Sequence, residues 1–267
     1  MAKRITSREN AALKSLVRLA SSSRERKEQS ATLLDGPHLV EAYRASGRTA
    51  TTLIVSDSGL EKDEIRELFE RAPARERMVL TDRLFGDIAQ VATPVGIAAV
   101  IPTPQPAALP DELETCVLLD DLQDWGNVGS IMRSAAAAGV RQVFLSKGAV
   151  FAWSPKVLRA GQGAHFFLSI YEDVDLVEIA GRFPGTVIVT DARARSSLFD
   201  ADLTGHTAWV FGNEGAGVEP RLAAAASLKV RIPMPGAAES LNAAAAAAVC
   251  LFEQVRQRSV RTPGARA

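Results

Sequence analysis

Three segments of the chain hold polar residues and glycines of the kinds that bind ligands or assist chemistry, at residues 120–133, 212–217 and 232–242. Arg133 in the first segment could grip a phosphate or stabilise a developing negative charge, because a guanidinium keeps its proton and can donate two parallel hydrogen bonds. Glu214 in the second could orient neighbouring groups by accepting hydrogen bonds, and the glycines around it allow a ligand to approach the backbone closely. Taken alone, each segment is a weak signal, because a glycine-rich turn after a strand is structural more often than functional.

The third segment reads as the end of a strand, a loop stiffened by proline and the start of a helix. Pro233 and Pro235 remove backbone donors, so a sheet ladder must end there. Ser240 is the predicted helix cap, and the alanines at 243–248 favour a helix. Open α/β sheets bind ligands at the carboxyl ends of strands, where the free amides of a helix start can hold an anion or a polar group. Because six consecutive alanines leave no bulk, we expect something to approach this helix closely.

Several other classes of site are disfavoured by the sequence. The second segment has its glycines in the order G-x-x-G-x-G, which is not the dinucleotide fingerprint, and Glu214 would meet a pyrophosphate with like charge. Neither a P-loop lysine nor a G-x-S-x-G nucleophile motif is present. The two cysteines, Cys116 and Cys250, and the three histidines show no metal-ligand spacing, so we expect no metal site.

The elements that must position these segments alternate regularly beyond residue 110, which predicts a parallel sheet with helices on both faces. The predicted strands are 116–119, 142–145, 166–170, 186–190, 208–211 and 228–232, and the predicted helices are 127–138, 155–161, 175–181, 220–226 and 241–257. Each chemistry-bearing segment follows a strand, so the loops should gather at one edge of the sheet. The first hundred residues predict a smaller α/β unit, with helices at 7–28 (capped by Ser7), 37–43, 63–71 and 81–88 and strands at 31–34, 51–55, 78–80 and 96–101.

Four prolines between residues 101 and 110 predict an extended, semi-rigid linker. We therefore expect an N-terminal domain at 1–101, a proline-rich linker at 102–110 and a second domain at 111–267. The whole chain is neutral, with 31 basic and 31 acidic residues, but residues 1–30 carry eight Lys and Arg against three Glu, a net charge of 8 − 3 = +5. A basic end on a neutral protein can guide a polyanion, although such segments are equally common as plain solvated surface.

The chain is 47% apolar and 23% charged, which is typical of a folded protein. Its two cysteines lie far apart in apolar settings, which favours buried free thiols and a reducing cytoplasm. The N-terminus lacks an apolar signal core, and no run approaches the ~18 apolar residues of a membrane span, so we expect a cytoplasmic protein without membrane contact.

Taken together and in this order, the three segments resemble the motifs of the SpoU/TrmH family of RNA ribose 2′-O-methyltransferases, part of the SPOUT class. The residues that carry the resemblance are Asn127, Gly129 and Arg133 in the first motif, Gly212, Glu214, Gly215 and Gly217 in the second, and Ile232, Pro233, Met234, Glu239, Ser240, Leu241 and Asn242 in the third. The resemblance covers roughly residues 115 to 257, and Trp125 and Asn213 stand where the family varies. Residues 1–100 resemble more loosely the L30e-like, ribosomal-protein-like domain that often precedes this catalytic domain.

The resemblance implies an α/β sheet whose C-terminal part forms a trefoil knot, a homodimer that packs through the region of the last helix, and S-adenosylmethionine as cofactor. The catalytic residues that it implies are Asn127, Arg133, Glu214, Ser240 and Asn242. The cofactor-binding residues that it implies are Gly212, Asn213, Ile232, Met234, Ser240 and Leu241. By the family's pattern Arg133 activates the ribose hydroxyl. A guanidinium does not readily give up its proton, so Arg133 has two further possible roles: it could bind the substrate phosphate, or it could stabilise the alkoxide that develops on the ribose oxygen.

The substrate implied by this two-domain plan is structured RNA, most often large-subunit (23S) ribosomal RNA in the family. Transfer RNA is the rival substrate. A different class of function also stays open, namely a catalytically silent RNA-binding or ribosome-assembly protein on the same scaffold. The intact polar residues of the motifs favour the enzyme.

Overall fold

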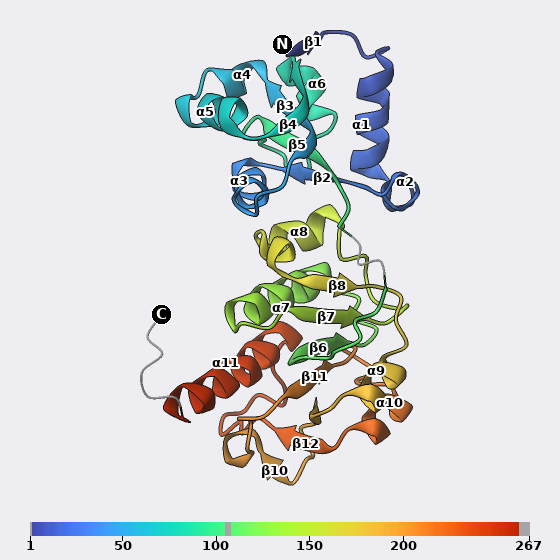
Figure 1. Ribbon diagram of the computed structural model, residues 1–267, viewed down its shortest axis with the longest axis vertical. Coiled ribbons are helices and arrows are strands. Elements are labelled where there is room, and N and C mark those ends of the chain that lie inside the picture. The colour runs from blue at the N-terminus through green and yellow to red at the C-terminus, as the bar shows by residue number, and fades with distance from the viewer. Residues whose placement is uncertain (1, 105–107, 262–267) are drawn as a thin grey trace. The chain divides into compact units, whose positions relative to one another are not determined.

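The computed structural model describes residues 2–104 and 108–261, and the chain divides into two compact units (Figure 1). The first unit comprises Met1–Pro104 together with Trp153–Phe166, and the second comprises Gln105–Ala152 together with Phe167–Ala267. Each unit has its own sheet and its own core.

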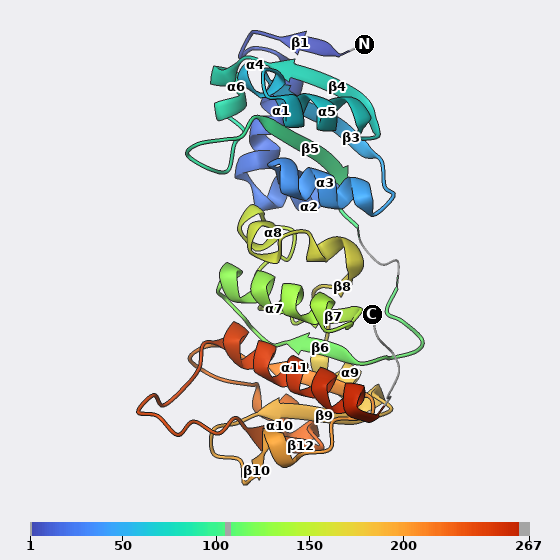
Figure 2. The same ribbon diagram turned by 90° about the vertical axis from the view of Figure 1, so that its left-hand side faces the viewer.

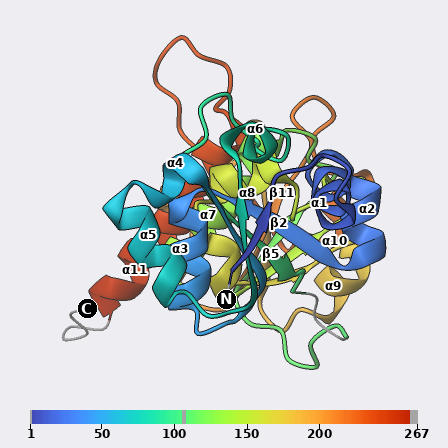
Figure 3. The ribbon, with the colours of Figure 1, turned by 90° about the horizontal axis from the view of Figure 1, so that it is seen from above.

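The first unit is built on a five-stranded sheet in the order β1-β4-β3-β5-β2, in which β1, β4 and β3 run parallel and β5 is antiparallel to both β3 and β2. Its strands are β1 (Lys3–Ile5), β2 (Ala31–Asp35), β3 (Ala50–Ser56), β4 (Ala74–Leu80) and β5 (Ile97–Pro102). Its helices are α1 (Ala11–Ser21), α2 (Ser23–Gln29), α3 (Pro37–Ala45), α4 (Asp57–Leu60), α5 (Asp63–Arg71), α6 (Asp82–Gly86) and α8 (Pro155–Gly161). Helices α1 and α2 lie on one side of the strands, and α3, α4 and α5 lie on the other (Figure 3).

The predicted single helix at 7–28 is wrong, because the structure divides it into α1 and α2 at Ser22. Ser22 has extended backbone angles, and its side chain accepts a hydrogen bond from the amide of Glu25, so it ends one helix and caps the next. The cap of α1 is Asn10 rather than Ser7. Strand β1 and helix α4 are three and four residues long, too short for a periodic pattern to predict them.

The second unit contains a seven-stranded sheet in the order β10-β12-β9-β11-β6-β7-β8, and every neighbouring pair is parallel. Its strands are β6 (Cys116–Leu119), β7 (Gln142–Leu145), β8 (Ser169–Tyr171), β9 (Thr186–Thr190), β10 (Ser196–Ser197), β11 (Thr207–Phe211) and β12 (Leu228–Arg231). Its helices are α7 (Trp125–Ala137), α9 (Leu176–Arg182), α10 (Pro220–Ala225) and α11 (Ala243–Arg261), with a single 3₁₀ turn at Leu198–Asp200. Another 3₁₀ turn, at Ala164–Phe167, follows α8 and lies almost wholly in the first unit. The predicted parallel α/β sheet is confirmed; the knot and the L30e-like character of the first unit stay predictions.

Strands β6 and β11 at the centre of this sheet are buried along their whole length because helices cover both faces. Helices α7 and α11 lie together on one face, and α9 and α10 lie on the other (Figures 1 and 2). Helix α11, which begins with the alanine run, packs on α7. Farther along α11, buried Gln254 accepts a hydrogen bond of 3.0 Å from the indole of Trp209 and donates to the carbonyl of Leu203, which fixes the helix to β11.

Two predicted boundaries in this part of the chain are wrong. The strand predicted at 166–170 begins as a 3₁₀ turn, and β8 covers only Ser169–Tyr171. The last helix begins at Ala243 rather than Leu241, and its cap is Asn242 rather than Ser240: the Oδ1 atom of Asn242 accepts from the amides two and three residues later. Asparagine and serine cap helices about equally well, so sequence preference did not decide between them.

Candidate functional site

The three segments singled out in the sequence follow β6, β11 and β12, whose carboxyl ends lie at one edge of the seven-stranded sheet. Strand β11 lies directly beside β6, and β9 lies between β11 and β12. The parallel arrangement therefore brings the first loop together with the other two, which follow it by roughly 80–120 residues, as the alternation of strands and helices predicted.

A chain of side-chain hydrogen bonds joins the three segments. Asn127, in the first turn of α7, donates from Nδ2 to Oε1 of Glu214 at 2.9 Å. Asn242 donates from its own Nδ2 to Oδ1 of Asn127 at 2.8 Å, and its Oδ1 caps α11. Asn127 is only 7% exposed. Its amide nitrogen donates to Glu214 and its amide oxygen accepts from Asn242, so the orientation of the side chain is fixed. Three of the five predicted catalytic residues thus meet in one network.

The carboxylate of Glu214 is held in its ionised form. Burial alone would raise the pKa of Glu214, but hydrogen bonds from Asn127 and from backbone amides outweigh that effect and lower it below its ordinary value. At neutral pH this side chain can accept hydrogen bonds or face a cation, and it has no proton to give to a substrate. We infer an orienting role from this geometry.

The glycine-rich loop between Phe211 and Val218 is a tight, internally bonded turn. The amides of Asn213 and Gly217 each donate to the other residue's carbonyl at 2.9 Å, and the Asn213 side chain accepts from two amides inside the loop. Gly217 has a φ of +75°, and a Cβ on Gly212 would lie 2.5 Å from the backbone of Gly217. The loop is closed so tightly that Gly212 has no room for a side chain.

A pocket of about 390 Å³ opens beside this loop. Its lining residues are Thr190, Phe211, Gly212, Asn213, Glu214, Gly217, Val218, Ser240, Leu241, Asn242, Ala243 and Ala246. Among the residues predicted to bind the cofactor, Gly212, Asn213, Ser240 and Leu241 line the pocket. Ile232 and Met234, half-buried just after β12, do not line it.

The pocket also contains residues that the sequence analysis did not name individually. Thr190 is the last residue of β9, and the carboxyl end of this strand lies between those of β11 and β12. Ala243 and Ala246 supply a wall without bulk. The sequence signal for Ala243 and Ala246 was the alanine run, which predicted that another group approaches this helix closely but did not identify that group.

Arg133 is not part of this pocket. It lies about 1.7 turns along α7 from Asn127, about 120° away around the helix by ideal geometry, and its side chain is exposed. It makes no hydrogen bond or ion pair with any residue that the structure describes in its own chain. Within one protomer, the structure thus brings together Asn127, Glu214, Ser240 and Asn242 and leaves Arg133 outside.

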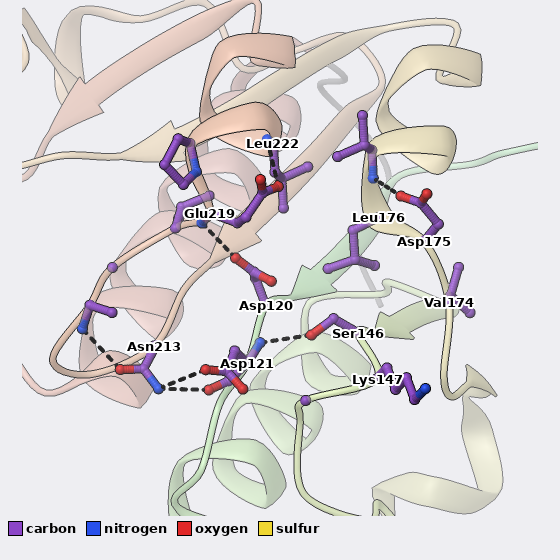
Figure 4. Close-up of a pocket in the computed structure, with 16 residues that line it drawn as sticks. Asp120, Asp121, Ser146, Lys147, Val174, Asp175, Leu176, Asn213, Glu219 and Leu222 are labelled. Atoms are coloured by element: carbon purple, nitrogen blue, oxygen red, sulfur yellow. Dashed lines mark hydrogen bonds between the residues drawn. The ribbon is translucent and has the colours of Figure 1, made fainter.

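A second pocket, of about 570 Å³, lies on the other side of the glycine-rich loop (Figure 4). Asn213, Gly217 and Val218 line both pockets, so this loop forms the wall between them. Asp120 accepts a hydrogen bond of 2.7 Å from the amide of Glu219, and Asp121 accepts from Asn213, so these acids brace loops. We assign the site to the smaller pocket, because the hydrogen-bond network and four predicted cofactor residues are there.

Two further classes of site were searched for over residues 2–104 and 108–261. No group of three or more His, Cys, Asp or Glu side chains in these ranges could hold a metal ion. None of the helices described is long and apolar enough to cross a membrane.

Comparison with known families finds two matches along the chain. The model of the SpoU rRNA Methylase family matches residues 114–252, which include the whole hydrogen-bond network and the pocket. The model of the MRM3-like substrate binding domain matches residues 10–99.

Individual relatives match over nearly the full length. The chain is 31% identical over 265 residues to an uncharacterized tRNA/rRNA methyltransferase of Synechocystis, covering 97% of this chain and 96% of the relative. It is 31% identical over 259 residues to the 23S rRNA (guanosine(2553)-2′-O)-methyltransferase RlmP of Bacillus subtilis, covering 94% and 98%. The crystal structure of the SpoU methyltransferase AviRb from Streptomyces viridochromogenes in complex with AdoMet superposes with a TM-score of 0.83, at 29% identity over 94% of this chain and 98% of that one.

Proposed function

The chain belongs to the SpoU rRNA Methylase family, and from this membership we propose that it transfers a methyl group from S-adenosylmethionine to a ribose 2′-hydroxyl of large-subunit ribosomal RNA. The observation that carries the proposal is the hydrogen-bond chain of Glu214, Asn127 and Asn242, which draws three distant loops together beside one pocket. A silent RNA-binding protein would have no need of this arrangement.

The pocket has the chemistry that S-adenosylmethionine requires. Gly212, Ala243 and Ala246 leave space for a flat ring, and Leu241, which is 42% exposed, offers an apolar surface beside it. The ionised carboxylate of Glu214 at the same pocket suits a ligand that carries a sulfonium and an ammonium group. We propose Gly212, Asn213, Ser240 and Leu241 as cofactor residues. Ile232 and Met234 do not line the pocket, so we propose that they have a supporting role in the loop that follows β12.

The reaction needs a nucleophile aligned with an already activated methyl group, which the sulfonium of the bound cofactor supplies. The protein therefore contributes mainly position, which can supply ~7–11 kcal/mol of the barrier. Asn127 and Asn242 fix the loops through their shared hydrogen bond, and Glu214 orients the groups at the pocket mouth. Arg133 would hold the substrate phosphate or stabilise the alkoxide that develops on the 2′-oxygen.

Arg133 can reach this pocket if a second copy of the chain supplies it. Large apolar side chains are exposed on the same two helices: Trp125 at the start of α7 is 42% exposed, and Phe252 and Val260 on α11 are 48% and 69% exposed. Phe252 and Val260 are two turns apart and share one face of α11. We propose that this face packs against its counterpart in a symmetric homodimer and brings Arg133 to the partner's pocket.

We propose that the N-terminal domain at 1–101, joined by the linker at 102–110 to the catalytic domain at 111–267, selects the RNA. The match to a substrate-binding domain over residues 10–99 supports this role. Transfer RNA is the second candidate substrate, because one relative of nearly equal length is named a tRNA/rRNA methyltransferase. A ribosomal substrate and two buried free thiols favour the cytoplasm as the compartment.

The proposal is tested by methyl transfer from labelled S-adenosylmethionine to ribosomal RNA, with subunit complementation. Arg133→Ala should abolish transfer while cofactor binding persists, and Gly212→Ala should lose both. If Arg133 acts across the dimer, an equal mixture of the two inactive variants contains mixed dimers with one intact site each. Such a mixture should recover roughly a quarter of the parent activity. No recovery would mean that Arg133 serves its own protomer's pocket or has another role.

A further inference from the structure

A third ligand-sized cavity lies entirely within the first unit. Its volume is about 570 Å³, within the ~300–1,000 Å³ range that is usual for ligand sites. It is lined by Arg8, Leu13, Lys14, Val17, Arg18 and Asp87, which come from α1, the segment before it and the end of α6. Three basic side chains thus surround an apolar floor of Leu13 and Val17.

One wall of this cavity is fixed by a two-pronged ion pair. The guanidinium of Arg8 donates from Nε and Nη2 to the two carboxylate oxygens of Asp87, at 3.0 and 2.8 Å. This pair ties the segment before α1 to the end of α6 and neutralises the charge of Arg8. This wall is therefore formed before any ligand binds, and Arg8 contributes more to the shape of the cavity than to its free positive charge.

The other two cations are available for exchange. Lys14 and Arg18 are four residues apart on α1, so both project from the same face of the helix. Lys14 pairs with Glu9, which is 83% exposed, and Arg18 lies 3.8 Å from Glu25. Such exposed pairs contribute about 0–1 kcal/mol, so a phosphate can displace either carboxylate at little cost.

The net charge of residues 1–30 and of the two acids that pair with them favours a polyanion. Residues 1–30 carry eight cations and three carboxylates. Adding Asp57 and Asp87, which pair with Arg4 and Arg8 from outside this segment, leaves 8 − 5 = +3. The matched substrate-binding domain includes five of the six lining residues, namely the four on α1 and Asp87.

We propose that this cavity binds one nucleotide of the substrate RNA, with its phosphate on Lys14 and Arg18 and its base or ribose against Leu13 and Val17. The proposal rests on the function proposed above and gives the RNA-selecting unit a defined contact. RNA fits better than an acidic peptide, because unpaired nucleotides of folded RNA present a flat, partly apolar group beside a phosphate, and the cavity offers the matching pair of surfaces.

The first test removes the two cations and compares a matched pair elsewhere in the same unit. Lys14→Gln with Arg18→Gln should weaken RNA binding roughly 5- to 8-fold at about 0.1 M salt and lower the salt slope by about 0.7–0.9, as expected for the loss of one phosphate contact. The control is Arg66→Gln with Arg71→Gln on α5, whose arginines also form exposed ion pairs with Asp63 and Glu41. The control should bind RNA within about two-fold of the parent.

The second test raises affinity instead of lowering it. Glu9→Gln frees Lys14 for phosphate and should tighten RNA binding several-fold at low salt. Glu28→Gln removes the same charge from the pair with Arg24, which does not line the cavity, and should have a smaller effect. Equal effects from the two glutamate variants would show that only general charge matters and would overturn the proposal.

The two proposals fail in different ways. If Lys14→Gln with Arg18→Gln binds RNA like the parent or like the arginine control, the cavity is not an RNA site, whatever the enzyme does. If the parent binds RNA through this cavity but transfers no methyl group, the enzymatic proposal fails and this one stands. The denaturant unfolding transition of the first unit should be unchanged in every variant, which separates lost RNA contacts from misfolding, and the Kd for S-adenosylmethionine, measured without RNA, should also be unchanged.

Discussion

Replacing Asn127 by Asp tests whether the hydrogen-bond chain holds the site together, because the two side chains have nearly the same shape. The Nδ2 atom that donates to Glu214 becomes an oxygen, and two carboxylates then face each other across about the 2.9 Å that now separates donor and acceptor. The other oxygen can still accept from Asn242. The change therefore reverses one contact and leaves the rest of the network in place.

The expected cost is bounded on both sides. Losing a hydrogen bond to a charged group removes about 1.5–3 kcal/mol. Full repulsion at this separation would be ~6 kcal/mol with an effective dielectric constant of about 20. The pair avoids it by binding a shared proton, which at pH 7 costs about 4 kcal/mol for a carboxyl of ordinary pKa. We therefore expect Asn127→Asp to lower the free energy of unfolding by about 1.5–4 kcal/mol at pH 7.

The pH dependence of this loss has a definite sign. In the variant the pKa of the shared carboxyl pair is raised in the folded state above its unfolded value. The penalty is therefore absent below about pH 4, where both states are protonated, and grows as pH rises toward 7. The difference in unfolding free energy between parent and variant, measured by denaturant titration at several pH values between 4 and 7, tests this expectation.

A second substitution provides the control. Adding Glu214→Gln to Asn127→Asp restores a donor and an acceptor with the direction reversed, and should recover at least half of the lost stability. The reasoning is refuted if Asn127→Asp costs less than ~0.5 kcal/mol at pH 7, or if the double variant is no more stable than the single one. Either result would mean that the contact does not join the loops in solution.

Three further predictions concern the loop, the last helix and the thiols. Gly212→Ala should weaken S-adenosylmethionine binding at least ~10-fold by calorimetry, because its Cβ would lie 2.5 Å from the backbone of Gly217, whereas Gly215→Ala, whose Cβ meets nothing within 3.7 Å, should bind normally; equal losses would contradict the steric account. Gln254→Ala should lower the unfolding free energy by ~2–4 kcal/mol in denaturant titrations, since it leaves the buried indole of Trp209 without its acceptor, and a loss under ~1 kcal/mol would count against it. Burial raises the pKa of both cysteine thiols to about 12, so at pH 8 the native protein should be alkylated at least ~100-fold more slowly than the unfolded protein, whose thiols have an ordinary pKa of about 8.5; mass spectrometry can follow both rates, and equal rates would contradict the burial of the thiols.

The general architecture was predictable because its signals are local. Continuous apolar runs such as 116–119 and 208–211 are typical of parallel strands buried on both faces, and the alternation with helices leaves few ways to arrange them. The gathering of the three loops follows from that arrangement. The break at Ser22 was missed because a serine-rich stretch is compatible with helix until the capping contact of its side chain is seen.

The detailed site was less predictable, since periodicity says nothing about partners across loops. Resemblance grouped Arg133 with Asn127, but they point to different sides of α7, and only Asn127 reaches the network. Ile232 and Met234 follow β12 in the expected place, yet the pocket wall is made by residues nearer α11. The sequence could not show that Asn242 would serve both as a helix cap and as the partner of Asn127.

The most direct test of the account is the chemical position of the transferred methyl group. Ribosomal RNA labelled by the purified protein from S-adenosylmethionine can be digested completely with alkali, a cleavage that uses the free 2′-oxygen of each nucleotide. The account predicts that the label is recovered in alkali-resistant dinucleotides and disappears with Arg133→Ala. Label recovered in single nucleotides would place the methyl on a base and would contradict the assignment of a ribose 2′-hydroxyl to this site.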